Sequence, residues 1–480
     1  MNRRMVFYTV GRMLTMESAL LLLPAIVALC YGERCFWSFL ITAAIALAAG
    51  MLMQVVFRPW TKLIYAKEGF IIVAMSWIFL SAIGALPFVI SGEIPSYVNA
   101  LFETVSGFTT TGASILTDVE SLSHGILFWR SFTHWIGGMG ILVFIVAIMP
   151  NVSDRTIHIL RAEMPGHSMG KLVPRLKDTA KILYLIYIAL TVVEIVFLIC
   201  GGMSVFESVV HTFGTAGTGG FGVRSDSIAS YSPYLQWVIA IFMLLFGINF
   251  NLYYLLLIRR FRSVFRSCEL WCYLGTVAIS IAAVTYNIYP LYHGFAQAFR
   301  YASFQVSSII TTTGFATADF NLWPGLSKTI LFLLMFVGGC AGSTAGGLKF
   351  SRAIILFRTI RRELRRMIHP RSLSTVKFEG KTVEDATLHS VNVYFAVYML
   401  CVAVIFLFLS FEPFDMETNL SATIACFNNI GPGFGAVGPA ANFEGYSVFS
   451  KLLLSMAMLL GRLEIFPLLL AFSPSTWSKK

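Results

Sequence analysis

The stretch FTTTGAS at residues 108–114 lies between two strongly apolar regions, and ITTTGFA at residues 310–316 repeats it in a similar setting. Three consecutive β-branched threonines followed by glycine are unfavourable in a helix, and glycine also weakens a strand. Irregular backbone is tolerated at membrane depth only where it is buried in protein or lines a water-filled cavity. The repeated turn therefore indicates a structured, non-helical segment inside a membrane-embedded region.

The composition indicates that the chain is embedded in a membrane. Of its 480 residues, 57% are hydrophobic and only 12% are charged, and the mean hydropathy is +0.76. A bilayer-spanning helix needs roughly 20 apolar residues, and such segments recur at 5–31, 36–57, 69–91, 126–150, 181–203, 233–258, 270–290, 326–357, 390–411 and 447–472. We expect an all-α integral membrane protein with ten transmembrane helices, one of them broken by GGCAGSTAGG (338–347).

The connections between these segments predict the orientation. Of the 35 Lys and Arg residues, 28 lie in 1–12, 58–67, 151–181, 259–266, 349–381 and the C-terminal pair, which fall on one side if ten spans alternate. The positive-inside rule makes that side cytoplasmic, with both termini. The net charge of +11 is thus confined to loops, which excludes a nucleic-acid partner. The scattered cysteines and histidines show no metal-ligand or catalytic spacing.

Four of the connections share one pattern. Each begins with a short helix-capable stretch, namely YVNALFETVSG, MSVFESVVHT, HGFAQAFRYASFQVSS and METNLSATIAC. Each then reaches a bulky residue, three small or polar residues and a glycine: Phe108 to Gly112, Phe213 to Gly217, Ile310 to Gly314 and Phe427 to Gly431. Such internal similarity predicts one structural unit used four times. We expect two N-terminal helices (1–67) and helix–pore-loop–helix repeats at 68–150, 151–267, 268–388 and 389–480.

Four such turns around one axis would present rings of carbonyl oxygens that replace the hydration shell of an ion. The preceding half-helices would aim their partially negative ends at the axis, which favours a cation. No carboxylate falls within a turn, which argues against calcium or magnesium. Close helix packing would explain a single turn, but not four matched ones. The expected filter residues are Thr110, Thr111, Gly112, Thr215, Ala216, Gly217, Thr312, Thr313, Gly314, Asn429, Ile430 and Gly431.

The motifs FETVSGFTTTGAS, HTFGTAGTGGFG, IITTTGFAT, FNNIGPGFGAVG and GGCAGSTAGG resemble those of the TrkH family of potassium-uptake proteins, in the Trk/Ktr/HKT superfamily. The resemblance implies repeats that each fold like one potassium-channel subunit, K⁺ as the transported ion and no organic cofactor in this chain. It also implies a homodimer in the bacterial inner membrane and a cytosolic nucleotide-binding ring of the TrkA type as partner. Extra glycines leave the register open by two or three residues in repeats two and four (Gly219, Gly220, Gly433 and Gly435).

Two further features interrupt apolar segments. The resemblance implies that the break at 338–347 is a flexible gating loop. The alternative is that its small residues simply allow close helix packing. The expected gate residues are Gly338, Gly339, Gly342, Gly346, Gly347 and Lys349. Arg462 lies inside the last span, where an unpaired charge is costly. We expect it to line the pore and limit cation passage, as the resemblance implies, with a structural ion pair to Glu103 or Glu207 as the alternative.

Competing functions are weaker or remain open. GTGGFG (217–222) and GFGAVG (433–438) satisfy GxGxxG but lack the βαβ context of a dinucleotide site. A membrane-embedded enzyme would need a catalytic constellation that the sequence does not show. Coupled K⁺/H⁺ or K⁺/Na⁺ symport remains open, because a symporter can use the same filter. The basic residues of 349–381 suit anionic membrane lipid or the cytosolic regulator.

Overall fold

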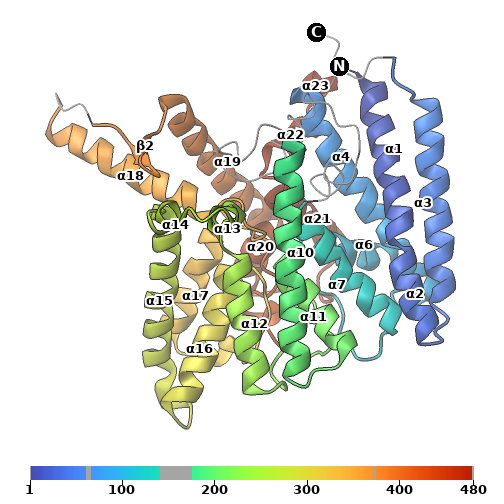
Figure 1. The fold of residues 1–480 in the computed structure, drawn as a ribbon, viewed down its shortest axis with the longest axis horizontal. Coiled ribbons are helices and arrows are strands. Elements are labelled where there is room, and N and C mark those ends of the chain that lie inside the picture. Colours follow the sequence, from blue (N-terminus) through green and yellow to red (C-terminus); the bar gives the residue numbers. More distant parts are fainter. Residues whose placement is uncertain (1, 61–65, 141–175, 371–373, 478–480) are drawn as a thin grey trace.

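A computed structural model of the chain describes residues 2–60, 66–140, 176–370 and 374–477. The second half of the expected fourth span (141–150) and most of the basic connection 151–181 lie outside the described residues. Figure 1 shows helices running mainly along one direction, with both chain termini at the same end of the bundle. We call this end the terminal face; there the Arg3 guanidinium donates to the Trp477 carbonyl at 2.6 Å.

The chain begins with two helical segments that pack against each other. α1 (Arg3–Leu20) continues into α2 (Leu22–Cys30), and α3 (Phe36–Val56) returns beside them. The contact depends on small residues: a Cβ on Gly11 would come within 2.8 Å of the Gly50 carbonyl oxygen. Gln54 of α3 also donates to the Thr15 hydroxyl of α1 at 2.8 Å. Small residues and interhelical hydrogen bonds are typical of helix pairs in lipid.

Four similar units follow, each with a long first helix, a short buried helix, an irregular return and a second helix. Their elements are α4 (Ala66–Gly84), α5 (Leu86–Ser91), α6 (Tyr97–Phe108) and α7 (His124–Gly138); α10 (Leu176–Cys200), α11 (Val205–Gly217) and α12 (Pro233–Phe246); α15 (Cys268–Ile288), α16 (Phe295–Ile310) and α17 (Gly325–Val337); α19 (Asp385–Leu409), α20 (Met416–Phe427) and α21 (Val448–Arg462). The short helices α6, α11, α16 and α20 coincide with the four half-helices expected from the sequence.

The remaining elements are short connections and extensions. They comprise the helices α13 (Phe250–Leu257), α14 (Phe261–Phe265), α18 (Phe350–Ile368), α22 (Phe466–Phe472) and α23 (Pro474–Trp477), the 3₁₀ turns η2 (Tyr289–Leu291), η3 (Phe320–Leu322) and η4 (Gly435–Val437), and the strands β1 (Lys377–Phe378) and β2 (Lys381–Thr382). The two strands form a small antiparallel hairpin after α18. Figure 1 shows α18 projecting sideways from the bundle.

Six stretches of the described chain are long and apolar enough to cross a membrane: Arg3–Cys30, Phe36–Val56, Lys67–Ser91, Ala180–Cys200, Cys268–Leu291 and Asp385–Leu409. The pair α12 and α13 would add a seventh, but its halves are bent by 90°. Large apolar side chains such as Trp37, Leu185 and Ile279 are exposed on these stretches, as lipid-facing residues are. The fold is that of a helical membrane protein, while the number of ten spans stays a prediction.

The second helices of the repeats do not run straight through. α7 reaches Gly138 and is followed by Gly140 with φ 84°. α12 bends at 247–249, α17 and α18 are separated by 338–349, and α21 ends before two residues with positive φ, Glu464 and Ile465. The sequence indicated only the third of these breaks. The four second helices therefore end after similar lengths of 15, 14, 13 and 15 residues.

Candidate functional site

The four half-helices end in turns that follow one backbone path. Each turn contains two residues in the left-handed region, separated by one residue. These pairs are Thr110 (φ 55°) and Gly112 (φ 78°), Thr218 (φ 55°) and Gly220 (φ 81°), Thr312 (φ 57°) and Gly314 (φ 83°), and Asn429 (φ 57°) and Gly431 (φ 97°). The left-handed region is uncommon for any residue except glycine and is a genuine outlier for β-branched threonine. A strained conformation kept at three equivalent threonines points to a functional requirement.

The four turns close into a ring, in which each glycine faces a carbonyl of the next turn. A Cβ on Gly112 would overlap the Gly219 carbonyl, one on Gly220 the Thr313 carbonyl, and one on Gly314 the Ile430 carbonyl. A Cβ on Gly431 would lie 2.7 Å from the Thr111 carbonyl oxygen. This contact joins the fourth turn to the first and closes the ring. In every case the facing carbonyl belongs to the residue that precedes the glycine of the neighbouring turn. Only glycine fits such close contacts, so the ring explains all four glycines together.

The ring changes the register expected for repeat two. Thr215, Ala216 and Gly217 belong to the last turn of α11 and do not occupy the position of Thr110 to Gly112. The residues with the matching backbone are Thr218, Gly219 and Gly220, three positions further on. The signal that could have shown this is Gly220-Phe221, which aligns with Gly314-Phe315 of repeat three. The turns of repeats one, three and four have the register expected from the sequence.

The threonine-rich turns are held by their own hydroxyl groups. The Thr109 hydroxyl donates to the Val105 carbonyl at 2.6 Å and lies 2.8 Å from the Thr111 hydroxyl. In repeat three Thr311 makes the same contacts, with the Ser307 carbonyl at 2.7 Å and with the Thr313 hydroxyl at 2.8 Å. These bonds end the half-helix and fix the first part of the turn. FTTTG and ITTTG are thus the same structure in two places.

Repeat four replaces the threonines with asparagines that bond outside their own turn. The Asn429 amide donates to the Thr111 hydroxyl at 2.9 Å and to the Met458 carbonyl of α21 at 3.0 Å. The Asn428 side-chain oxygen accepts from the Tyr398 hydroxyl at 2.9 Å. Asn429 therefore connects the last turn to the first, which helps to close the ring.

Cavities lie on both sides of the ring. A small cavity of about 160 Å³ adjoins the residues that leave the turns, and its lining includes all four ring glycines, Gly112, Gly220, Gly314 and Gly431. A larger cavity of about 1040 Å³ is lined by Asn249, Lys349, Arg462 and other residues near the breaks of the second helices. Backbone oxygens of the ring thus separate two hollow regions.

The segment 338–349 lies directly against the ring on the side of the larger cavity. The Gly346 amide donates to the Thr312 hydroxyl at 2.6 Å, and a Cβ on Gly346 would overlap the Asn428 carbonyl. Gly338, Gly342, Gly347 and Lys349 all have positive φ, so the segment is an irregular loop. We call it the plug loop.

The plug loop is also attached to repeat two and to the first helix of its own repeat. The Cys340 amide donates to the Gly247 carbonyl at 3.0 Å, and the Phe250 amide donates to the Gly342 carbonyl at 3.0 Å, so the loop bonds to the bend between α12 and α13. At the start of α15, the Glu269 carboxylate accepts from the Ala341 amide at 2.7 Å. The loop is therefore held by several discrete hydrogen bonds rather than by a continuous helix. Gly338, Gly339, Gly342, Gly346, Gly347 and Lys349 all lie on it, as the sequence predicts.

Arg462, the last residue of α21, connects this loop to the first repeat. Its guanidinium donates to the Thr344 carbonyl of the plug loop at 2.9 Å, to the Gly138 carbonyl of α7 at 2.7 Å, and to the Gly137 carbonyl. The side chain also lines the larger cavity. Arg462 thus places a positive charge beside the cavity and the loop.

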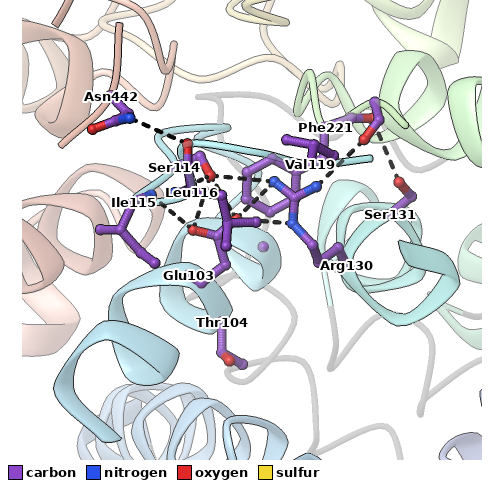
Figure 2. Close-up of polar contacts among 12 residues, drawn as sticks. Glu103, Thr104, Ser114, Ile115, Leu116, Val119, Arg130, Ser131, Phe221 and Asn442 are labelled. Carbon is purple, nitrogen blue, oxygen red and sulfur yellow. Dashed lines mark hydrogen bonds and ion pairs between the residues drawn. The ribbon is translucent and has the colours of Figure 1, made fainter. Parts of the chain in front are cut away.

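The alternative ion pair of Arg462 with Glu103 or Glu207 is wrong. Glu103 pairs with Arg130 at 2.7 Å, and Glu207 lies 3.6 Å from Arg224. Figure 2 shows Arg130 between Glu103 and Phe221, beside the chain that leaves the first turn. An Arg within the apolar helix α7 needs a partner, which is a signal that the sequence contained.

These features define a class of protein: a helical membrane protein in which four re-entrant units surround one axis. The chain belongs to the TrkH family, described as a cation transport protein, which matches residues 37–480. The resemblance seen in the sequence is thereby confirmed, and the chain is a membrane transporter and not an enzyme.

The similarity extends over the whole chain. The Trk system potassium uptake protein TrkH of Escherichia coli (strain K12) is 37% identical over 484 residues, which cover 99% of this chain and 100% of that protein. The Trk system potassium uptake protein TrkG of the same strain is 37% identical over 486 residues, covering 99% and 98%. The crystal structure of the potassium transporter TrkH from Vibrio parahaemolyticus superimposes with a TM-score of 0.88 at 33% identity, covering 100% of both chains.

Proposed function

We propose that this protein takes up potassium ions through the ring of four turns. The observation that carries the proposal is the closed ring itself, in which four glycines each face a carbonyl of the next turn. The relatives described above, which are potassium uptake proteins by name, support K⁺ as the transported ion. A ring of backbone oxygens without carboxylates suits a monovalent cation whose hydration shell must be replaced.

The proposed filter residues follow from the ring. They are Thr110, Thr111, Gly112, Thr218, Gly219, Gly220, Thr312, Thr313, Gly314, Asn429, Ile430 and Gly431, with backbone carbonyls as the main ligands. The half-helices α6, α11, α16 and α20 end at these turns, so the negative ends of their dipoles favour a cation there. No organic cofactor has a part in this proposal.

The plug loop is the proposed gate. It lies against the ring and beside the larger cavity, where it would obstruct an ion that leaves the filter. Discrete hydrogen bonds hold it, so a rearrangement of a few contacts would open the path. Arg462 would stabilise the closed loop through Thr344 and would repel cations from the cavity.

The setting of this transporter is proposed from the charge distribution and the resemblance. Both termini lie on one face, and the basic residues near it suit the cytoplasmic side of a bacterial inner membrane and its anionic lipids. A homodimer and a cytosolic nucleotide-binding ring of the TrkA type are the proposed partners. The five units expected from the sequence remain the proposed domain organisation.

The filter assignment is tested by Gly314→Ser, with Gly92→Ser as the matched control. Both glycines have a φ near +80°, so serine strains the backbone at each position. A Cβ at Gly314 would overlap the Ile430 carbonyl, whereas one at Gly92 meets nothing within 4 Å. We expect Gly314→Ser to lower the ratio of rubidium to sodium flux in proteoliposomes, and Gly92→Ser to keep it. A wild-type ratio in folded Gly314→Ser protein would refute the filter.

The same proteoliposomes distinguish a passive pore from coupled symport. Rubidium flux is measured while the membrane potential and the pH and sodium gradients are varied independently. Flux that follows only the electrochemical gradient of the transported ion indicates a gated pore. A requirement for a proton or sodium gradient would instead establish the K⁺/H⁺ or K⁺/Na⁺ symport alternative.

A further inference from the structure

We propose that Arg130 and Glu103 are positioning residues that set the spacing between the first and second turns of the ring, and thereby its discrimination between cations. This inference rests on the proposed function, because it concerns the same ring. Neither residue belongs to a turn. Glu103 lies on α6 and Arg130 lies on α7, and their side chains are almost completely buried, with exposures of 0% and 2%.

Glu103 holds the chain that leaves the first turn. Its carboxylate accepts from the Ser114 hydroxyl at 2.9 Å and from the Ile115 amide at 3.1 Å. It also accepts from Arg130 Nε at 2.8 Å and Nη2 at 2.7 Å. Figure 2 shows these bonds converging on one carboxylate. Since Ser114 is two residues beyond Gly112, Glu103 fixes the first turn directly after its ring glycine.

Arg130 extends the same network to the second turn. Its Nη1 donates to the Gly222 carbonyl at 3.3 Å, and its guanidinium lies 4.0 Å from the centre of the Phe221 ring. Phe221 and Gly222 are the two residues after Gly220, just as Ala113 and Ser114 are the two residues after Gly112. A planar fork with five donors can bond to two partners at once, so it fixes their relative position as well as attracting them.

Two other junctions of the ring are held differently. Between the second and third turns, the Ala316 amide donates to the Ser227 hydroxyl at 3.1 Å. Between the fourth and first, the Phe443 amide donates to the Ser114 carbonyl at 2.9 Å. Those two junctions use hydrogen bonds between neutral groups, whereas the first and second turns are joined by Arg130, a charged donor that Glu103 of the same repeat holds in place. The junction of the first and second turns therefore differs from these two in its dependence on a buried charged side chain.

The ion pair also balances charge at the filter. Arg130 contributes to the lining of the small cavity that adjoins the ring glycines. A guanidinium there would repel arriving cations, but the carboxylate of Glu103 neutralises it at 2.7 Å. A buried pair is weak support for stability, because desolvation offsets the attraction between the charges. A role in setting geometry beside the ring accounts for its presence better than stability does.

The test compares ion discrimination in Arg130→Lys and Ser114→Ala. Lysine keeps the charge but lacks the fork that reaches both turns, and alanine removes the hydroxyl that lies between Glu103 and Arg130. The control is Lys328→Gln, which removes one charge of an exposed pair with Glu417 at 3.8 Å. Rubidium and sodium fluxes are measured in proteoliposomes, and the melting temperature of each variant is recorded.

We expect Arg130→Lys to lower the rubidium-to-sodium flux ratio by about fivefold and Ser114→Ala by about twofold, because bonds from charged donors are the stronger ones. Lys328→Gln should keep the wild-type ratio. If Arg130→Lys does not yield folded protein, the milder Ser114→Ala decides. A lowered melting temperature with an unchanged flux ratio in the variants would overturn the proposal, because it would show a structural role only.

The result also separates this inference from the filter assignment. If Gly314→Ser changes the flux ratio while Arg130→Lys and Ser114→Ala do not, the positioning role is refuted and the filter stands. If Gly314→Ser leaves the ratio unchanged, the filter itself is refuted.

Discussion

Replacing Arg462 with glutamine should raise ion flux through the resting protein. The guanidinium donates to the Thr344 carbonyl of the plug loop at 2.9 Å and, on α7, to the Gly138 carbonyl at 2.7 Å. Of these described bonds, the one to Thr344 has to break when the loop moves, because Gly138 lies on α7 and not on the loop. The substitution therefore removes one bond that is specific to the closed state.

The size of the effect follows from that single bond. A hydrogen bond from a charged donor contributes about 1.5–3 kcal/mol. Since about 1.4 kcal/mol corresponds to a factor of ten, the ratio of open to closed protein should rise about ten- to a hundredfold. Removing the positive charge from the cavity acts in the same direction. Rubidium uptake into proteoliposomes, measured without any cytosolic partner, reports the change.

Two further variants separate the contributions. Arg462→Lys keeps the charge but loses the planar fork, so an intermediate rise would show that the bond to Thr344 matters beyond repulsion. Lys451→Gln is the control on the same helix, because Lys451 contacts the Asn99 side chain at 3.0 Å near the other end of α21. Its uptake should match the wild type. Wild-type or reduced uptake in folded Arg462→Gln protein would refute the reasoning.

Three other substitutions test single contacts. Thr312→Val removes the hydroxyl that accepts from the Gly346 amide, so resting rubidium uptake should rise, and an unchanged rate would show that this bond does not hold the plug loop. Gly461→Ala should lower the melting temperature, at a cost of about 2 kcal/mol or more, because its Cβ would overlap the Phe427 carbonyl at the end of α20. Gly275→Ala lies inside α15, where an added Cβ would meet nothing within 4 Å, so it should instead stabilise the protein by about 0.5–1 kcal/mol. Thermal denaturation in detergent measures the melting temperatures of the Gly461→Ala and Gly275→Ala variants. Equal melting temperatures would contradict the close packing at Gly461.

Several features of the fold were predictable because they depend on local physical chemistry. Apolar length gave the long helices, and the four half-helices were recognisable as short apolar stretches before glycine. The plug loop was found from its glycines, including Gly338 and Gly347, because such a run cannot continue a helix across a membrane. The irregular turns at Gly112 and Gly314 were recognisable because three consecutive threonines followed by glycine disfavour a helix.

The sequence left open those features for which two positions have similar local propensities, such as where a helix ends or bends. Repeat two offers glycines at both Gly217 and Gly220, and only the match of Gly220-Phe221 with Gly314-Phe315 of repeat three favours the second one. The bend after α12 and the break after α21 contain ordinary residues such as Asn249 and Glu464, which carry no strong local signal.

The sequence by itself determined that this is a helical membrane protein, and it indicated four related units with an irregular, glycine-containing turn in each. The tertiary structure decided which glycine of repeat two enters the ring and which cation the buried Glu103 carboxylate meets. Gly220 is selected because its Cα faces the Thr313 carbonyl of another repeat. Glu103 meets Arg130 rather than Arg462 because α6 and α7 bring them within 2.7 Å. Both outcomes depend on contacts between segments that are distant in the chain, and neither propensity nor spacing contains that information.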